Sequence, residues 1–241
     1  MASKRAERAA ARRVRDKWRA KVWYTIIAPD TFSAKELGMT PANDPNKVIG
    51  RIAEATLYDL TGDFKKMHVK LYFKINRIQG TNAYTRFIGH DMTTDYIRRM
   101  VRRRRSRIDA IFPVLTADGY KLRVKVIAVP DKRIKSSIKS EIRKKIMDYL
   151  FAKATEMTFS EYVKYLLSED VRKDLSKVVK PVYPVRRIEV RKSEVLVFPE
   201  EKVVELEREE EKKEIEVEAP EEESTESEGE EPSKEMQVEE E

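Results

Sequence analysis

The chain has 241 residues, among them 50 lysines and arginines, 43 aspartates and glutamates, and no cysteine. The lack of cysteine excludes disulfides, thiolate catalysis and cysteine-ligated zinc, and with only two histidines we expect no metal and no cofactor. The net charge of +7 hides two opposed regions: residues 200–241 hold 21 glutamates against five lysines and arginines, a net of −16, which leaves +23 on residues 1–199. A body this basic favours a nucleic acid as partner over an anionic membrane surface.

The hydropathy pattern gives no sign of a membrane segment. No uncharged run exceeds eight residues, and the first residues lack the apolar stretch of a secretory signal. We therefore expect a cytoplasmic protein that does not bind a membrane.

Residues 1–18 are predicted to form a basic arm that becomes ordered only when a polyanion neutralises it. Its cations alternate with alanines and leave few apolar side chains to dock on a core. The residues in and beside this arm that we expect to contact a nucleic acid are Arg5, Arg8, Arg12, Arg13, Arg15, Lys17, Trp18 and Arg19. A segment that only increases solubility is the alternative.

The first half of the body reads as strands separated by turns. Residues 22–29 are rich in β-branched and aromatic residues, and a loop punctuated by proline and asparagine follows them. Further strands are predicted at residues 50–60, 68–75 and 83–90. We expect residues 19–198 to fold as one domain.

The strand at residues 68–75 is expected to bury one face and expose the other. Its outer face would present a mixture of basic and aromatic side chains, which are Lys70, Tyr72 and Lys74. This face could meet RNA, with Tyr72 or Trp18 stacking on unpaired bases, but an ordinary solvated face explains the pattern equally well.

Seven arginines fall within ten residues of the chain. A short helix is predicted to begin at Thr93 or Thr94, with Ile97, Met100 and Val101 as its buried seam. The arginines that project from this seam or follow it are Arg98, Arg99, Arg102, Arg103, Arg104, Arg105 and Arg107. One or two cations suffice to complement a helix C-terminus, so seven indicate a polyanion, which we take to be RNA.

A β-hairpin and three helices are predicted for the second half. Every second residue is apolar over 108–114 and again over 122–126, on either side of the Asp118-Gly119 turn. The exposed face of this hairpin carries the candidate RNA ligands Lys121, Arg123 and Lys125. The helices are expected at residues 134–150, 158–167 and 170–179. A last strand at residues 185–198 carries the candidates Arg186, Arg187 and Arg191.

Residues 199–241 are expected to be a disordered acidic tail. Their composition offers too little apolar area to offset the entropy of ordering. Simple solubilisation is the first interpretation, and shielding of the basic face or binding to a basic partner are the others.

The sequence contains no recognisable catalytic motif. The sequence has no glycine-rich phosphate loop, zinc spacing or nucleophile motif. Asp91, Asp95 and Asp109 would be the ligands of a nuclease-like magnesium site, but Asp95 is better explained by the helix start and Asp109 by a strand position facing the arginines. We expect a protein without enzymatic activity.

Several longer segments carry a resemblance to one family. They are KVWYTIIAP at 21–29, ANDP at 42–45, IGR at 49–51, LTGD at 60–63, GHDMTTDYIRRMVRRRRSRIDA at 89–110, DGYKLRVK at 118–125 and YPVRRIEVRK at 183–192. In this order and spacing the body resembles the small-subunit ribosomal proteins of archaea and eukaryotes called the eukaryotic-type S-one, or S-three-Ae, family, and its archaeal members in particular.

The resemblance implies a fold of the α+β class, with a β-barrel-like, mainly antiparallel sheet core and packed helices. It implies a structural constituent of the small ribosomal subunit, present in a single copy and bound to ribosomal RNA on the platform, near the messenger exit and the RNA 3′ end. Neighbouring ribosomal proteins would be partners, with messenger RNA and initiation factors as further candidates. A free-standing RNA-binding regulator or chaperone, and a metal-dependent nuclease, remain the alternatives.

Overall fold

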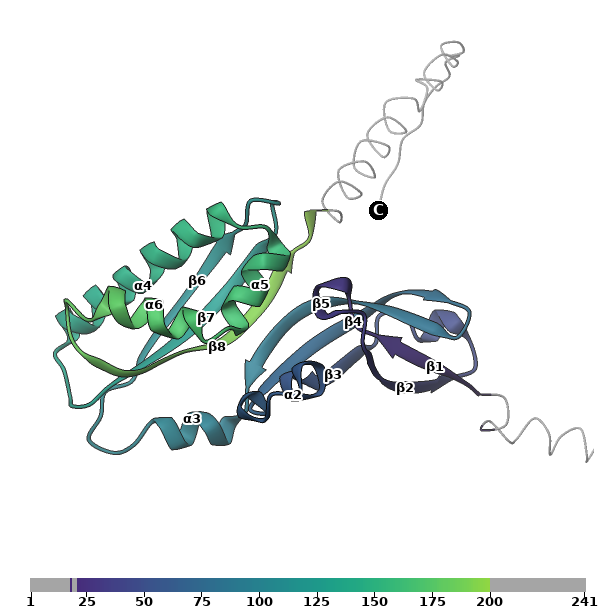
Figure 1. Cartoon of the computed structure of the whole chain (residues 1–241), viewed down its shortest axis with the longest axis horizontal. Coiled ribbons are helices and arrows are strands. Elements are labelled where there is room, and N and C mark those ends of the chain that lie inside the picture. The colour runs from purple at the N-terminus through teal and green to yellow at the C-terminus, as the bar shows by residue number, and fades with distance from the viewer. Residues whose placement is uncertain (1–17, 19–20, 200–241) are drawn as a thin grey trace, which may run out of the picture. The chain divides into compact units, whose positions relative to one another are not determined.

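The protein was analysed as a computed structural model, which describes Trp18 and residues 21–199 (Figure 1). The described residues all belong to one compact unit that ends at Pro199. Apart from Trp18, the predicted basic arm lies outside the described residues, and so does the acidic segment from residue 200 onwards.

Among the described residues, eight strands form one sheet that is antiparallel except where β1 meets β5, so the predicted α+β class with a mainly antiparallel sheet is confirmed. The strands are β1 (Val22–Ile27), β2 (Glu36–Ala42), β3 (Ile52–Thr56), β4 (Val69–Gln79), β5 (Asn82–Met92), β6 (Ile108–Leu115), β7 (Lys121–Pro130) and β8 (Val185–Val197). Their order is β2-β1-β5-β8-β7-β6. Outside this order, β4 pairs with β5, and β3 pairs with β4.

Strand β5 connects the branches of this sheet. It pairs with β4 along its whole length, with β1 near its start and with β8 near its end. At the β5–β8 junction a side chain on Gly89 would overlap the backbone carbonyl of Ser193, so only glycine permits this approach. The next residue, His90, is buried, and its Nδ1 lies 2.6 Å from Ser193 Oγ.

The helices are α2 (Leu57–Thr61), α3 (Thr94–Met100), α4 (Ser136–Glu156), α5 (Phe159–Leu167) and α6 (Asp170–Val179). Helices α4, α5 and α6 cover one face of β6, β7 and β8 (Figure 1). As expected from the isoleucine stripe, Ile142 and Ile146 of α4 are fully buried in the main core. Apolar residues spaced by three and four positions build this face because they fall on one side of a helix.

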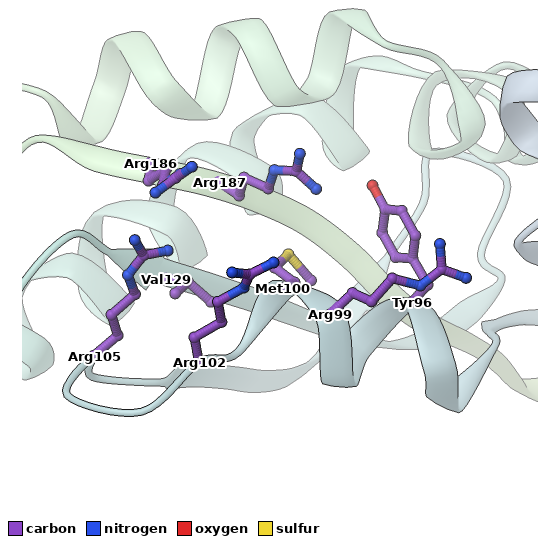
Figure 2. Close-up of a pocket in the computed structure, with 8 residues that line it drawn as sticks. All are labelled: Tyr96, Arg99, Met100, Arg102, Arg105, Val129, Arg186 and Arg187. Atoms are coloured by element: carbon purple, nitrogen blue, oxygen red, sulfur yellow. The ribbon is translucent and has the colours of Figure 1, made fainter.

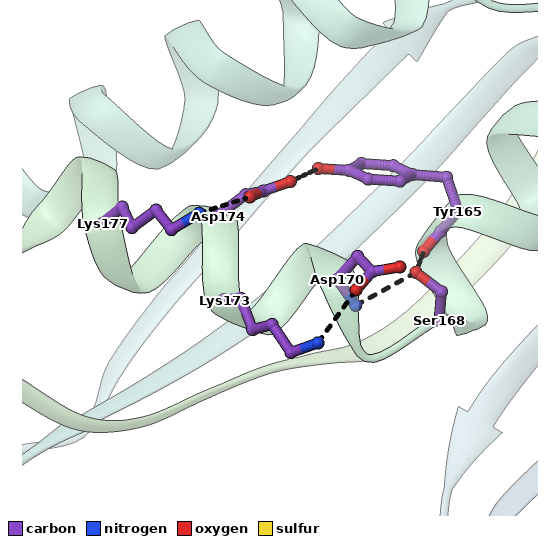
Figure 3. A network of polar contacts seen from close by, with 6 residues as sticks. All are labelled: Tyr165, Ser168, Asp170, Lys173, Asp174 and Lys177. Atoms are coloured by element: carbon purple, nitrogen blue, oxygen red, sulfur yellow. Dashed lines mark hydrogen bonds and ion pairs between the residues drawn. The ribbon is translucent and has the colours of Figure 1, made fainter.

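Helices α5 and α6 are joined by polar contacts at their edge (Figure 3). The Tyr165 hydroxyl donates to the Asp174 carboxylate at 3.1 Å, and Lys177 lies 3.7 Å from the other oxygen of that carboxylate. Ser168 Oγ donates to the Tyr165 carbonyl and accepts from the Asp170 backbone N–H, which fixes the turn between the helices. These contacts keep α5 and α6 in place above the sheet.

Two local expectations were wrong. The loop predicted after β1 contains strand β2, which pairs with β1 in spite of Gly38 and Pro41. The strand predicted over residues 50–60 ends at Thr56, where α2 begins. The Thr56 side chain accepts from the Asp59 backbone N–H and the Asp59 carboxylate accepts from Thr56 in return, so a capping box starts a helix there.

Candidate nucleic-acid interface

The arginine-rich run does not continue the helix that we expected. Helix α3 ends at Met100, and Val101 is already extended, with φ −92° and ψ 104°. Ile97 and Met100 are buried as predicted and Val101 is half-buried. The expectation that Arg102, Arg103 and Arg105 project from helical faces is therefore wrong, because the chain must turn here to enter β6.

The loop that carries these arginines is anchored at a defined point. Ser106 is buried, and its hydroxyl accepts a hydrogen bond of 3.1 Å from the Ile134 backbone N–H, just before α4. Arg104 sits at φ 64°, a left-handed conformation that costs a residue with a Cβ about 1 kcal/mol. This turn separates Arg102 from Arg105 and lets both side chains return toward the same side of the loop (Figure 2).

An arginine-lined cleft of about 350 Å³ lies between this loop, α3 and the start of β8. We call it the arginine cleft. It is lined by Tyr96, Arg99, Met100, Arg102, Arg105, Val129, Arg186 and Arg187 (Figure 2). The sequence singled out all five of these arginines. It did not indicate that the run after α3 and the pair on β8 would meet.

The charges of the arginine cleft are largely uncompensated. Within residues 21–199, no carboxylate lies within ion-pair distance of Arg99, Arg102, Arg105 or Arg187, while Arg186 lies 3.7 Å from Asp131. Guanidinium groups do not lose their protons in proteins, so a cluster of this kind is relieved only by an anion. Phosphate oxygens are suited to it, because each guanidinium can donate two parallel hydrogen bonds.

One wall of the cleft is fixed from behind by a buried polar group that the sequence did not reveal. Glu189 of β8 is buried, accepts a 3.0 Å hydrogen bond from the Tyr96 hydroxyl and lies 3.1 Å from Arg172 Nε. Burial raises the pKa of Glu189, although Arg172 and Tyr96 act against this shift. Burial also raises the pKa of Tyr96, so its hydroxyl stays a donor. The only sequence signal was the spacing of Tyr96 and Arg99, which places them on one helix face.

Most other candidates lie away from the cleft. Arg98, Arg103 and Arg104 are exposed outside its lining, and Arg107 pairs with Asp109 at 2.9 Å. The Nε of Arg191 is buried without a hydrogen-bond partner.

The open face of the sheet, away from α4, holds the lysine candidates. Lys70 forms an ion pair with Glu54, and Lys125 lies 3.5 Å from Glu194. The remaining candidates on the strands β4 and β7 are the half-buried Tyr72 and Lys74 and the exposed Lys121 and Arg123. Carboxylates therefore neutralise part of this face.

Trp18 is the one described member of the predicted basic arm. Its side chain is exposed, and the Lys21 ammonium lies 3.7 Å from the centre of its ring. The expected contacts of Arg5, Arg8, Arg12, Arg13, Arg15, Lys17 and Arg19 lie outside the described residues.

The three aspartates of the nuclease hypothesis are engaged elsewhere. Asp91 lies 3.7 Å from Lys192, and Asp109 pairs with Arg107. Asp95 is an exposed residue in the first turn of α3. Over the part of the chain that the structure describes, no three acidic or histidine side chains gather as a metal site would require. None of its helices has the length and apolar character needed to cross a bilayer.

Known proteins match the chain over nearly the whole of this body. The family model of the Ribosomal S3Ae family matches residues 9–199. Relatives named small ribosomal subunit protein eS1 are 46% identical over 186 residues in Desulfurococcus amylolyticus, covering 77% of this chain and 87% of the relative, and 45% identical over 190 residues in Methanopyrus kandleri, covering 77% and 90%. A third, from Methanothermobacter thermautotrophicus, is 45% identical over 192 residues, covering 80% and 98%. The resemblance seen in the sequence is confirmed, and the chain belongs to the Ribosomal S3Ae family.

Proposed function

We propose that this protein is a non-catalytic structural component of the small ribosomal subunit and that it binds ribosomal RNA through the arginine cleft. Membership of the Ribosomal S3Ae family and the names of the relatives support the ribosomal role. The convergence of five arginines from α3, the following loop and β8 is the observation that carries the RNA-binding role.

The cleft would act as a clamp on the RNA backbone. Its arginines come from segments far apart in the chain, so their spacing is set by the fold and they can grip phosphates of two strands that approach each other. The binding free energy would come from phosphate neutralisation, and recognition from the shape of the folded RNA. Affinity should therefore fall steeply as salt rises.

Membership of the family supports a wider setting as part of the same proposal. We propose that the protein sits in a single copy on the platform of the subunit, near the messenger exit and the RNA 3′ end, in the cytoplasm. Neighbouring ribosomal proteins would contact it, with messenger RNA and initiation factors as further candidates. Residues 1–18 would add an RNA-binding arm to the body at residues 19–198, and residues 199–241 would form the acidic tail.

Binding to small-subunit RNA, measured over a range of salt concentrations, tests this role. Replacing Arg99, Arg102 and Arg105 with serine removes three charge-assisted contacts of about 1 kcal/mol each, so affinity should fall by about two orders of magnitude. The slope of log affinity against log salt is negative, and its magnitude should also fall by about 2.

Three other arginines of the same run provide a matched control. Replacing Arg98, Arg103 and Arg104 with serine changes the net charge equally but leaves the lining of the cleft intact. This control should keep most of the affinity, and equal losses in both variants would reject the cleft as the binding site. Co-sedimentation of the unaltered chain with small subunits through a moderate-salt wash separates the ribosomal role from that of a free-standing regulator, which would stay in the light fractions.

A further inference from the structure

A second cleft lies among α2, α5 and the short 3₁₀ helix η1 (Asp30–Phe32), and we call it the α2–α5 groove. Its volume is about 250 Å³. The apolar part of its lining consists of Phe32, Leu57, Leu60 and Leu167. Close to the lining along the chain, Phe64 and Met67 are 70% and 50% exposed. Apolar side chains that the fold leaves uncovered in this way indicate a contact surface.

Contacts between the walls fix the shape of the α2–α5 groove. Thr31 Oγ1 lies 3.2 Å from Ser160 Oγ, which joins η1 to α5. Lys35 Nζ donates to the Asp59 carbonyl at 2.6 Å, which joins the chain after η1 to α2. Between these two anchors, Ser33 lines the groove in a left-handed conformation, with φ 64°. The groove is therefore formed before anything binds, and a ligand would not have to order its walls.

Two lysines give the groove a local positive charge. Lys66 and Lys164 belong to its lining, and no carboxylate does. Lys66 lies 4.0 Å from Asp63, whereas within residues 21–199 no carboxylate lies within ion-pair distance of Lys164. A cation beside apolar side chains is complementary to a ligand that carries a carboxylate next to an apolar group.

The surroundings of the groove favour a protein ligand over an RNA backbone. Asp30, Asp63 and Glu161 lie within three positions of lining residues along the chain, so a continuous row of phosphates would meet like charges. The lining also lacks the arginines that characterise the arginine cleft. Its volume is below the roughly 300–1,000 Å³ of sites that enclose a whole small molecule, which suits a side chain of a docked protein.

We propose that the α2–α5 groove is the docking site of a neighbouring protein in the small subunit. A segment of that protein packs one bulky apolar side chain against Phe32 and Leu167 and places an adjacent carboxylate beside Lys164. This inference rests on the ribosomal role proposed above and adds a protein-binding surface to it. The chain then contacts RNA through the arginine cleft and a protein through the α2–α5 groove.

Cysteine labelling tests whether the groove is covered, because the natural sequence has no cysteine. The full-length variant Ser33→Cys places a thiol at an exposed position of the lining. A maleimide should react with this thiol about tenfold more slowly in purified small subunits than in the free chain. We call the ratio of the two rates the protection.

Charge variants test whether the lysines hold the ligand. Adding Lys66→Gln and Lys164→Gln should reduce the protection by about fivefold, because two ion pairs with the ligand are weakened. Adding Lys144→Gln and Lys145→Gln, which removes two exposed cations of α4 instead, should leave the protection unchanged. Equal protection in all three backgrounds would overturn the role of the lysines.

A photoreactive residue identifies what covers the groove. In assembled subunits, p-azidophenylalanine in place of the exposed Phe64 should attach to a protein segment with a bulky apolar residue beside an aspartate or glutamate. The same residue in place of Phe151, on α4, should not attach to that segment.

Three results would overturn the proposal. Attachment of the residue at position 64 to RNA would make the groove a second RNA site, and equal maleimide rates in subunits and free chain would mean that nothing covers it. Both results leave the ribosomal role intact, since co-sedimentation of the variants with small subunits reports that role separately. Variants absent from the subunits, together with an unaltered chain that is also absent, would reject the ribosomal role and this partner.

Discussion

The hydroxyl of Tyr96 donates a 3.0 Å hydrogen bond to the buried carboxylate of Glu189 and thereby joins α3 to β8. The same two elements carry Arg99 on one side of the arginine cleft and Arg187 on the other. Cations that repel each other are therefore held together by a neutral donor and a buried carboxylate behind them. This contact makes cleft geometry depend on residues that need not touch RNA.

Replacing Tyr96 with phenylalanine should lower the free energy of unfolding by about 1–2 kcal/mol, because a buried carboxylate loses a hydrogen-bond donor. The stacking of this ring on His68, with centroids 3.8 Å apart, should persist. Urea unfolding measures the change, and Tyr58→Phe, at an exposed tyrosine, is the control. RNA affinity should fall in Tyr96→Phe although no charge is removed. An unchanged affinity would show that the cleft keeps its shape without this bond.

Alanine at Gly89 should weaken the β5–β8 junction by about 3 kcal/mol or more, because the new methyl group meets backbone that cannot move aside locally. Gly62→Ala is the matched comparison. Gly62 has φ 75°, and a Cβ added there would meet no atom within 4 Å, so only its backbone preference is lost, at about 1 kcal/mol. Urea midpoints of the two variants give the difference, and equal destabilisation would contradict the close approach at Gly89.

Acid should destabilise the folded chain through His90. Burial lowers the pKa of His90 to about 4 from its ordinary 6.5, and its Nε2–H donates to the Val190 carbonyl while Nδ1 accepts from Ser193. Between pH 6.5 and 4 the unfolded chain binds a proton that the folded chain does not, so stability falls as pH decreases, by at most about 3 kcal/mol.

Unfolding midpoints of the unaltered chain and of His90→Gln over this pH range measure the effect. The variant should be less stable than the unaltered chain at pH 7, but its stability should fall less as the pH decreases. Burial lowers the pKa of His68 and so adds to the decline in both proteins, whereas the raised pKa of Glu189 opposes it in both. Parallel curves would exclude His90 as the source.

Elements with strong local signals could be predicted from the sequence. Thr158 caps α5 through the Glu161 backbone N–H, and the alternating residues on each side of the Asp118-Gly119 turn do form a hairpin. Both features depend on residues a few positions apart, so the sequence displays them directly. The capping box of Thr56 and Asp59 was equally local, but the β-branched and aromatic residues around it favoured a strand.

The assembly of the cleft could be predicted only in part. Charge identified Arg99, Arg102 and Arg105 as candidates because seven arginines have no structural use at the end of a short helix, and it identified Arg186 and Arg187 as basic positions of the last predicted strand. Which arginines share a cleft depends on the pairing of β8 with β5 and β7, and on the end of α3 at Met100. These are tertiary contacts between distant segments, and neither charge nor periodicity encodes them.

Alanine at Ser106 should weaken RNA binding without removing any charge. The Ser106 hydroxyl accepts from the Ile134 backbone N–H, and this bond fixes the loop that carries Arg102 and Arg105. Its loss should lower the free energy of unfolding by about 1 kcal/mol and let the two guanidinium groups sample more orientations. RNA affinity should then fall several-fold while the salt slope stays the same, because the number of cations is unchanged. Ser140→Ala, at an exposed position of α4, should alter neither quantity. A shallower slope of log affinity against log salt in Ser106→Ala would instead mean that the loop no longer contacts the RNA.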